Sequence, residues 1–263
     1  MKARILILIS LLALITLFVA SIKADNEVES ASMDQDDPPF SGTIFIDPDI
    51  ITEDDPTVFL DITYAGTGSR RMFDRRENGR ITVDAYLFNV NYNDGISIEF
   101  QVNPEFASSE NAAVEAEKYA IVIGRIPTVL RKDVKTVFIH KGNKPFGGGN
   151  NNLLIHTEQA DRYVERGILE ETFVHEASHT SLDAEHAKDS DWIKAQNADG
   201  KFISNYARDY PVREDIAESF LPYLAVKFRS DRISAELKNI IETTIPGRIE
   251  YFDNQALDLT PIK

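Results

Sequence analysis

The chain of 263 residues has no cysteine and little positive charge. Without cysteine it cannot form disulfides, zinc–thiolate sites, iron–sulfur clusters or a thiol nucleophile. Its 28 Lys and Arg face 43 Asp and Glu, which gives a formal net charge of -15. Because an acidic surface without a local basic patch repels phosphate backbones, we expect no nucleic-acid partner. Any nucleophile in this chain is therefore a hydroxyl, a carboxylate or a metal-activated water.

Long apolar runs are also scarce, and only residues 5–20 approach the length of a membrane span. A permanent span of a hydrocarbon core about 30 Å thick needs about 20 residues. Lys2 and Arg4 precede this shorter run, and the small residue Ala24 follows it, which is typical of a secretory signal. We therefore expect residues 1–24 to be a signal peptide and the mature chain to be secreted, without a stable membrane span. The alternative is an uncleaved N-terminal membrane anchor.

The next segment, residues 25–39, is polar and acidic without Lys or Arg, and we expect a flexible leader there. Residues 40–263 have the length and composition of one folded domain. The oligomeric state stays open.

Within this domain, strand patterns come first and helix patterns second. Strands are expected at 43–46, 58–64, 81–91, 96–102, 135–140 and 153–157, with a hairpin turn at Asn93-Asp94-Gly95. Helices are expected at 109–130 (interrupted at Pro127), 167–182, 211–228 (starting at Pro211) and 233–243. This order predicts an α+β domain. The Gly- and Asn-rich residues 141–152 are interpreted as a mobile rim loop.

The chemistry-bearing motif is His175-Glu176-Ala177-Ser178-His179, an H-E-x-x-H sequence that holds two of the five histidines. Residues four apart on a helix share one face, so both imidazoles can reach a single Zn²⁺. Glu176 then stands beside that ion and can act as a general base. A catalytic zinc needs a third protein ligand and a fourth position for water.

Three candidates compete for the third ligand: the metzincin position, His186, and a later pair of glutamates. A metzincin would have glycine at 182 and histidine at 185, where this chain has Leu182 and Glu185, and no methionine follows the motif. His186 lies seven residues after His179, a rise of about 10 Å on a continuous helix, so it becomes a ligand only if the helix breaks near Asp183.

The third candidate is the pair Glu214 and Glu218, which lie one turn apart on the expected helix 211–228. One carboxylate can bind zinc while the other orients a histidine. We favour Glu214 as the ligand and keep His186 as the alternative.

Residues 167–228 resemble the gluzincin branch of zinc metallopeptidases, which pairs H-E-x-x-H with a glutamate on a later helix. The segment EDIAESF at 214–220 is similar to the E-x-x-x-E segment, E-F-F-A-E-A-F, of anthrax lethal factor-like peptidases. The resemblance implies a zincin-like domain. It also implies that His175, His179 and Glu214 hold zinc, that Glu176 is the general base, and that Glu218 supports the ligand set.

Those peptidases also carry a tyrosine seven residues before the ligand glutamate, which stabilises the oxyanion. This chain has Ala207 at that position, with Tyr206 one residue earlier and Tyr210 three residues later. We favour Tyr206 and keep Tyr210 as the alternative.

Together these features predict a secreted zinc metallopeptidase that cleaves polypeptide. The strand at 153–157 is expected to form the edge along which an extended peptide lies. His140 and His156 are interpreted as ordinary strand histidines. Two alternatives stay open: a non-catalytic exported zinc-binding protein, and a zinc amide hydrolase that acts on a non-protein polymer.

Overall fold

The computed structural model describes residues 37–263, so the expected signal peptide and most of the leader lie outside the described residues. No helix in this described part is long and apolar enough to cross a membrane. Pro38–Lys263 forms one compact unit.

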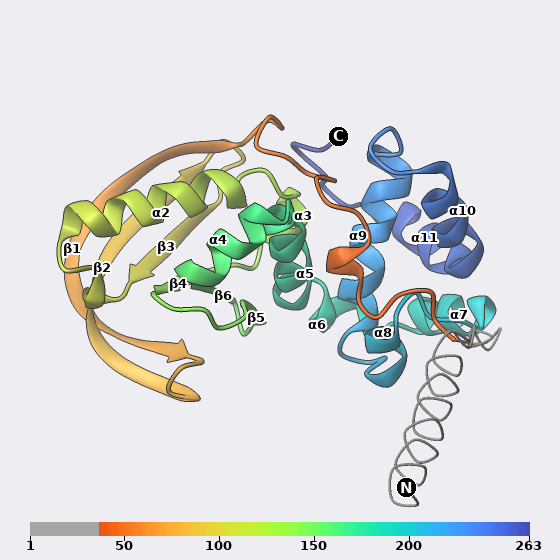
Figure 1. The fold of residues 1–263 in the computed structure, drawn as a ribbon, viewed down its shortest axis with the longest axis horizontal. Helices are drawn as coiled ribbons and strands as arrows, with labels where there is room; N and C mark the ends of the chain where they lie inside the picture. The colour runs from red at the N-terminus through yellow and green to blue at the C-terminus, as the bar shows by residue number, and fades with distance from the viewer. Residues whose placement is uncertain (1–36) are drawn as a thin grey trace, which may run out of the picture. The chain divides into compact units, whose positions relative to one another are not determined.

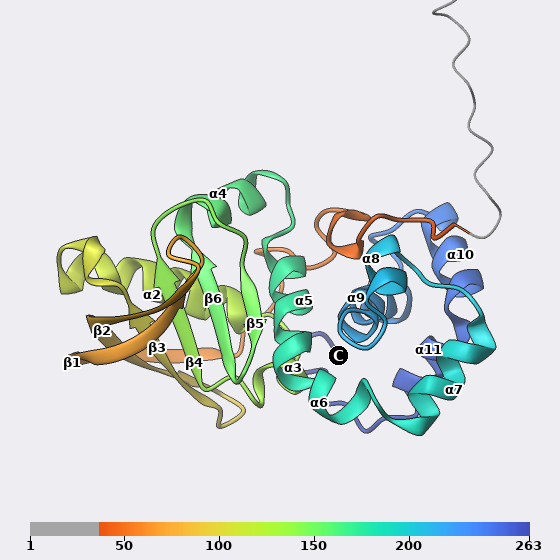
Figure 2. The same cartoon turned by 90° about the horizontal axis from the view of Figure 1, so that it is seen from below.

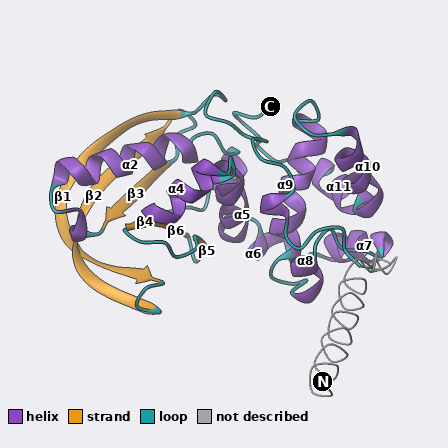
Figure 3. Cartoon of the chain, viewed as in Figure 1, coloured by secondary structure: helices purple, strands orange, loops and turns teal. Residues whose placement is uncertain are grey.

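A six-stranded sheet occupies the earlier half of this unit, and the helices gather in the later half (Figures 1 and 3). The strands are β1 (Phe59–Asp74), β2 (Gly79–Tyr92), β3 (Ser97–Val102), β4 (Thr136–His140), β5 (Gly147–Gly149) and β6 (Asn152–His156). Their order in the sheet is β1-β2-β3-β4-β6-β5. The pairs β3–β4 and β4–β6 are parallel, and the remaining neighbours are antiparallel. The predicted α+β class is confirmed.

The helices cover one face of the sheet and then form a separate layer. They are α2 (Ser109–Ile123), α3 (Thr128–Arg131), α4 (Thr157–Glu165), α5 (Leu169–Ser181), α6 (Asp183–His186), α7 (Ser190–Asp199), α8 (Asn205–Asp209), α9 (Asp215–Phe228), α10 (Ala235–Thr244) and α11 (Pro246–Asp253). Two short 3-10 turns are η1 (Thr43–Phe45) and η2 (Pro104–Phe106). Helix α5 contacts β5 and β6 on one side and α9 on the other (Figure 2). It is therefore the central element of the described chain.

Burial fixes α5 in place. Phe173 on α5 packs with Tyr119 of α2 and Phe146 before β5, and all three rings are buried. Polar side chains on α5 form hydrogen bonds within the helix; for example, the Ser178 hydroxyl donates to the Val174 carbonyl at 2.7 Å. A helix buried on most of its sides holds its polar residues at fixed positions, which is what a metal centre requires.

Several expected elements differ from the structure. Residues 43–46 are not a strand, because the Thr43 amide donates to Glu218 and the Ile46 amide to the Thr43 carbonyl, which closes the turn η1. Helix α9 begins at Asp215, not at Pro211. The amides of Arg213 and Glu214 both donate to the Tyr210 carbonyl and form a turn before the helix.

The region around β5 also differs. The Gly- and Asn-rich residues 141–152, expected as a rim loop, contain the strand β5. The strand at 153–157 was wrongly expected to form the sheet edge, since β6 lies between β4 and β5. Glycine has low strand propensity, so the pairing of β5 is visible only in three dimensions.

Candidate metal centre

Three potential ligand atoms converge between α5 and the start of α9. The Nε2 atoms of His175 and His179 lie 3.3 Å apart. Glu214 Oε2 lies 3.1 Å from His179 Nε2 and 3.6 Å from His175 Nε2. A tetrahedral ion with bonds of about 2.0–2.1 Å separates its ligands by about 3.3 Å. The three atoms therefore have the mutual spacing of three corners of a zinc site.

A carboxylate lies behind each imidazole: Asp183 is hydrogen-bonded to His179, whereas Glu218 lies near His175 without a hydrogen bond to it. His179 Nδ1 lies 2.8 Å from Asp183 Oδ2, and His175 Nδ1 lies 3.4 Å from Glu218 Oε1. A neutral imidazole has one N–H, so a ring that donates from Nδ1 to a carboxylate presents a lone pair at Nε2. The Nε2 lone pair of His179 then meets the buried Glu214 Oε2, which accepts no hydrogen bond within the described residues. A cation between them removes the repulsion, so the donor set fits a divalent metal.

The charges of the site agree with this. Burial opposes ionisation of Glu214, but both histidines lower the pKa of its carboxyl. Burial likewise opposes a charge on His179, but Asp183 and Glu214 raise the pKa of its imidazole to about 10. A proton and a metal ion thus compete for the same position between these groups.

Glu218 is held by a segment that is distant in sequence. Its Oε2 accepts a hydrogen bond from the Thr43 amide at 2.8 Å, and the Ser204 hydroxyl also bonds to it. Glu218 and Thr43 are fully buried. The carboxylate beside His175 is therefore fixed from two sides, by η1 and by the residue that caps α8.

Asp183 is a functional residue that the sequence reasoning missed. Helix α5 ends at Ser181, and the short helix α6 begins at Asp183, which places its carboxylate against His179. The only signal in the sequence is its position four residues after His179, the spacing that brings side chains together on a helix.

His186 does not join the cluster. The chain does break near Asp183, as a role for His186 requires, but the break turns this histidine toward α11. Its Nδ1 lies 2.7 Å from the Tyr251 hydroxyl, and the side chain is buried there. Among the described residues, the group with metal-ligand spacing is His175, His179 and Glu214.

The ligand atoms open into a polar hollow of about 350 Å³. Glu176 and Tyr206 line it together with both histidines, while Tyr210 does not. Burial and the charge of Glu214, to which its hydroxyl bonds, raise the pKa of Tyr206 to about 12, so the phenol keeps its proton at neutral pH. The Tyr210 ring packs edge-to-face against the Tyr206 ring, with centroids 5.5 Å apart, and Tyr210 is 54% exposed. The favoured tyrosine is thus the one that faces the ligands.

No protein-family model, curated protein or solved structure matches this chain. Its function is therefore argued from the side chains of this site.

The edge strand β5 lies directly against the site helix. A side chain at Gly148 would overlap the Glu176 carbonyl, so only glycine permits this approach. The Thr180 hydroxyl accepts from the Gly149 amide at 2.8 Å and donates to the Asn152 carbonyl at 3.1 Å. The sheet edge is in this way joined to α5 one turn after the general base predicted by the motif.

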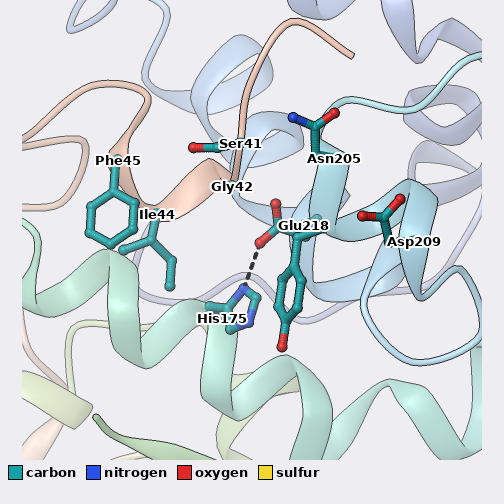
Figure 4. A pocket seen from close by; sticks show the side chains of 9 residues that line it. Ser41, Gly42, Ile44, Phe45, His175, Asn205, Asp209 and Glu218 are labelled. Carbon is teal, nitrogen blue, oxygen red and sulfur yellow. Dashed lines mark ion pairs between the residues drawn. The ribbon is translucent and has the colours of Figure 1, made fainter. Parts of the chain in front are cut away.

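A second pocket, of about 410 Å³, opens on the other side of His175. Figure 4 shows Ile44 and Phe45 on one side of it and Asn205 and Asp209 on the other, with His175 and Glu218 between them. His175 and Tyr206 line both this pocket and the polar hollow, so the two spaces are neighbours. The ligand atoms therefore lie within a cleft that continues to both sides.

Proposed function

We propose that this protein is a secreted, zincin-like zinc metallopeptidase that hydrolyses peptide bonds. The observation that carries the proposal is the convergence of His175 Nε2, His179 Nε2 and Glu214 Oε2 in an open hollow that Glu176 also lines. The resemblance of the H-E-x-x-H and E-x-x-x-E segments to gluzincins supports the same conclusion. Residues 1–24 carry the features of the signal peptide, and N-terminal sequencing of the secreted protein is expected to begin near Asp25.

Each side chain has a role in that reaction. Zinc held by the three ligands would supply Lewis acidity, which would acidify water and polarise a carbonyl. Glu176 accepts the proton of the attacking water and passes it to the leaving amine. The Tyr206 hydroxyl donates a hydrogen bond to the oxygen on which negative charge develops. Asp183, through its hydrogen bond to His179 Nδ1, would keep the Nε2 lone pair of that ring directed at the ion, and the carboxylate of Glu218 lies 3.4 Å behind His175.

The cleft favours a polypeptide over a non-protein amide. Strand β5 forms the outer edge of the sheet in the described chain and borders the hollow through Gly148 and Gly149. An extended peptide can add to such an edge through backbone hydrogen bonds. The pocket beside Ile44 and Phe45 offers space for an apolar side chain on the other side of the ligands.

The decisive experiment compares Glu176→Ala with Glu185→Ala, which changes an exposed acid on α6. Both variants should hold one zinc ion per chain. Glu176→Ala should lose cleavage of a proteome-derived peptide library by about 10²–10⁴-fold, the usual contribution of a general base, whereas Glu185→Ala should keep it. Wild-type protein that binds no stoichiometric zinc would refute the proposal.

A further measurement separates a catalytic from a purely structural ion. A catalytic zinc keeps a ligand position open, and a structural one does not. We expect a peptide hydroxamate to bind the zinc-loaded protein and to lose binding when zinc is removed. Zinc without hydroxamate binding would point to the non-catalytic alternative.

A further inference from the structure

Two arginines next to the proposed active site have no carboxylate partner. Most arginines of this acidic chain form ion pairs, such as Arg70 with Glu99 and Arg125 with Glu170. In the described chain, by contrast, Arg75 donates only to the Phe146 carbonyl and Arg80 only to the Arg71 carbonyl. Both belong to the β1–β2 hairpin, Arg75 in its turn and Arg80 at the start of β2.

These two side chains line one hollow of about 240 Å³ beside β5. Its other lining residues are Phe73, Gly147, Gly148, Gly149, Asn150, Asn152 and Leu154. None of them is acidic, in a chain whose formal net charge is -15. This hollow is therefore a local region of positive charge with amide groups beside it.

The hollow is continuous with the metal centre. Arg75, Gly148, Gly149 and Asn150 line both this hollow and the one that contains the ligand atoms. The acids that line the hollow with the ligand atoms already have partners or roles, because Asp183 and Glu214 contact the imidazoles and Glu176 is the proposed base. They do not neutralise Arg75 or Arg80 by any ion pair within the described residues.

The hairpin turn that carries Arg75 is firmly held. The adjacent Asp74 is buried, and its carboxylate accepts hydrogen bonds from the backbone amide and the guanidinium of Arg76. Arg76 in turn makes a two-bond contact with Glu105. Arg75 Nη2 donates to the Phe146 carbonyl at 2.7 Å, directly before β5. One of its five N–H donors is thus used for positioning, and the others stay available for a ligand.

We propose that Arg75 and Arg80 form a binding site for a carboxylate side chain of the substrate. A polypeptide that lies along β5 places one of its side chains beside these guanidinium groups, and an Asp or Glu there gains charge-assisted hydrogen bonds. The substrates are then polypeptides with an acidic residue a short distance from the cleaved bond. This inference rests on the proposed peptidase function, which supplies the polypeptide.

The test measures binding without turnover, in zinc-loaded full-length Glu176→Ala protein. Labelled peptides that differ only in Glu, Gln or Lys at one scanned position are titrated, and fluorescence anisotropy gives their Kd values. At one position the Glu peptide should bind about tenfold more tightly than the Gln peptide, and the Lys peptide should bind more weakly still. This preference should shrink as ionic strength rises.

Substitutions locate the preference. Arg75→Gln combined with Arg80→Gln should abolish the Glu-over-Gln difference, and Arg75→Glu with Arg80→Glu should favour the Lys peptide. Arg162→Gln is the matched control, since Arg162 on α4 is exposed and lines neither hollow. Thermal melting of each variant checks that it is folded, and Arg75→Lys should retain part of the preference because it keeps the charge.

Equal binding of the Glu and Gln peptides at every position would overturn the inference. So would a loss of preference in Arg162→Gln as large as that in the double variant. If the wild-type protein cleaves no peptide while the arginine-dependent preference persists, the proposed peptidase function fails and the carboxylate site stands.

Discussion

The chain has two pairs of neighbouring histidines, and only one of them is arranged for a metal. His175 and His179 lie one turn apart on α5, with ring centroids 4.9 Å apart. His140 and His156 are register partners on β4 and β6, with stacked rings 5.5 Å apart. A carboxylate lies near each pair, so residue composition alone does not distinguish them.

The strand pair uses its ring nitrogens for structure. His140 Nε2 lies 3.1 Å from the Phe73 carbonyl, and its Nδ1 lies 2.9 Å from the Asn103 side-chain amide. His156 Nδ1 lies 3.0 Å from the Lys141 carbonyl. The nearby acid, Asp74, is 3.6 Å from His140 and 3.9 Å from His156 and is already bound by Arg76. The interpretation of these residues as strand histidines agrees with this arrangement.

The pKa shifts of His140 and His179 run in opposite directions. Burial lowers the pKa of His140 to about 4, because Asp74 only partly compensates the desolvation. Partial burial opposes a charge on His179 as well, yet the hydrogen bonds and charges of Asp183 and Glu214 raise the pKa of its imidazole to about 10. What distinguishes a candidate ligand is therefore an acid at hydrogen-bond distance behind the ring together with a second acid in front of it.

The largest expected effect is on zinc content. Glu214→Ala removes an anionic ligand and should reduce bound zinc from one ion per chain to almost none after dialysis against micromolar zinc. Asp74→Asn changes an acid that is not one of the three ligands, and His186→Ala changes a histidine that is not one of them. Both variants should keep the ion. If His186→Ala loses more zinc than Glu214→Ala, His186 is the third ligand and the assignment of Glu214 is wrong.

Asp183→Asn comes next. It retains the shape of the side chain but removes the charge behind His179, and such partners typically contribute 10–100-fold to metal affinity. Competition with a chromogenic chelator should show a loss of that size. Glu185→Gln, which changes a neighbouring exposed acid on α6, should leave the affinity unchanged.

The buried acid Glu171 on α5 offers a contrast without any histidine. Burial raises the pKa of Glu171 to about 8, aided by Glu170 and opposed by hydrogen bonds from the backbone of Ile50 and Ile51. The folded state then holds a proton that the unfolded chain releases, so the free energy of unfolding falls as pH rises from about 4.5 to about 8. Urea titrations of the wild type should show this fall. In Glu171→Gln the decrease in the free energy of unfolding over the same pH range should be smaller by about 2–4 kcal/mol.

The smallest effect concerns the strand pair and has the opposite sign. Because folded His140 resists protonation, the unfolded chain binds more protons between about pH 4 and 6.5, and stability is lost as pH falls through this range. His140→Gln should remove about 1–3 kcal/mol of that dependence, again measured by urea titration. An unchanged acid slope would show that Asp74, Glu105 and His156, which surround it, determine the behaviour instead.

The local part of the site could be predicted from the sequence. His175 and His179 share a helix face because of their spacing, and the structure also places Glu214, Glu218 and Tyr206 beside them. The expectations for His175 and His179 depended on the motif and on helical periodicity. Those for Glu214 and Glu218 depended on helical spacing and on the resemblance to gluzincins, and Tyr206 came from that resemblance alone.

The remaining parts depend on contacts between distant segments. The hydrogen bond from the Thr43 amide to Glu218 joins residues 175 positions apart, and no local sequence pattern predicts it. Strand β5 consists of glycines, whose pairing follows from their fit against Glu176 and Thr180 and not from strand propensity. Asp183 takes its role from a helix break at Leu182 that neither glycine nor proline marks.

The contact between Thr43 and Glu218 also limits how far the chain can be shortened from its amino end during maturation. Proteolytic trimming that stops before Phe40 leaves the Phe40 and Ser41 carbonyls bonded to the amides of Asn205 and Tyr206. A cut beyond Thr43 removes the amide that steadies the acid behind His175. Such trimming would therefore disturb the proposed metal site without removing His175, His179, Glu214 or Glu176.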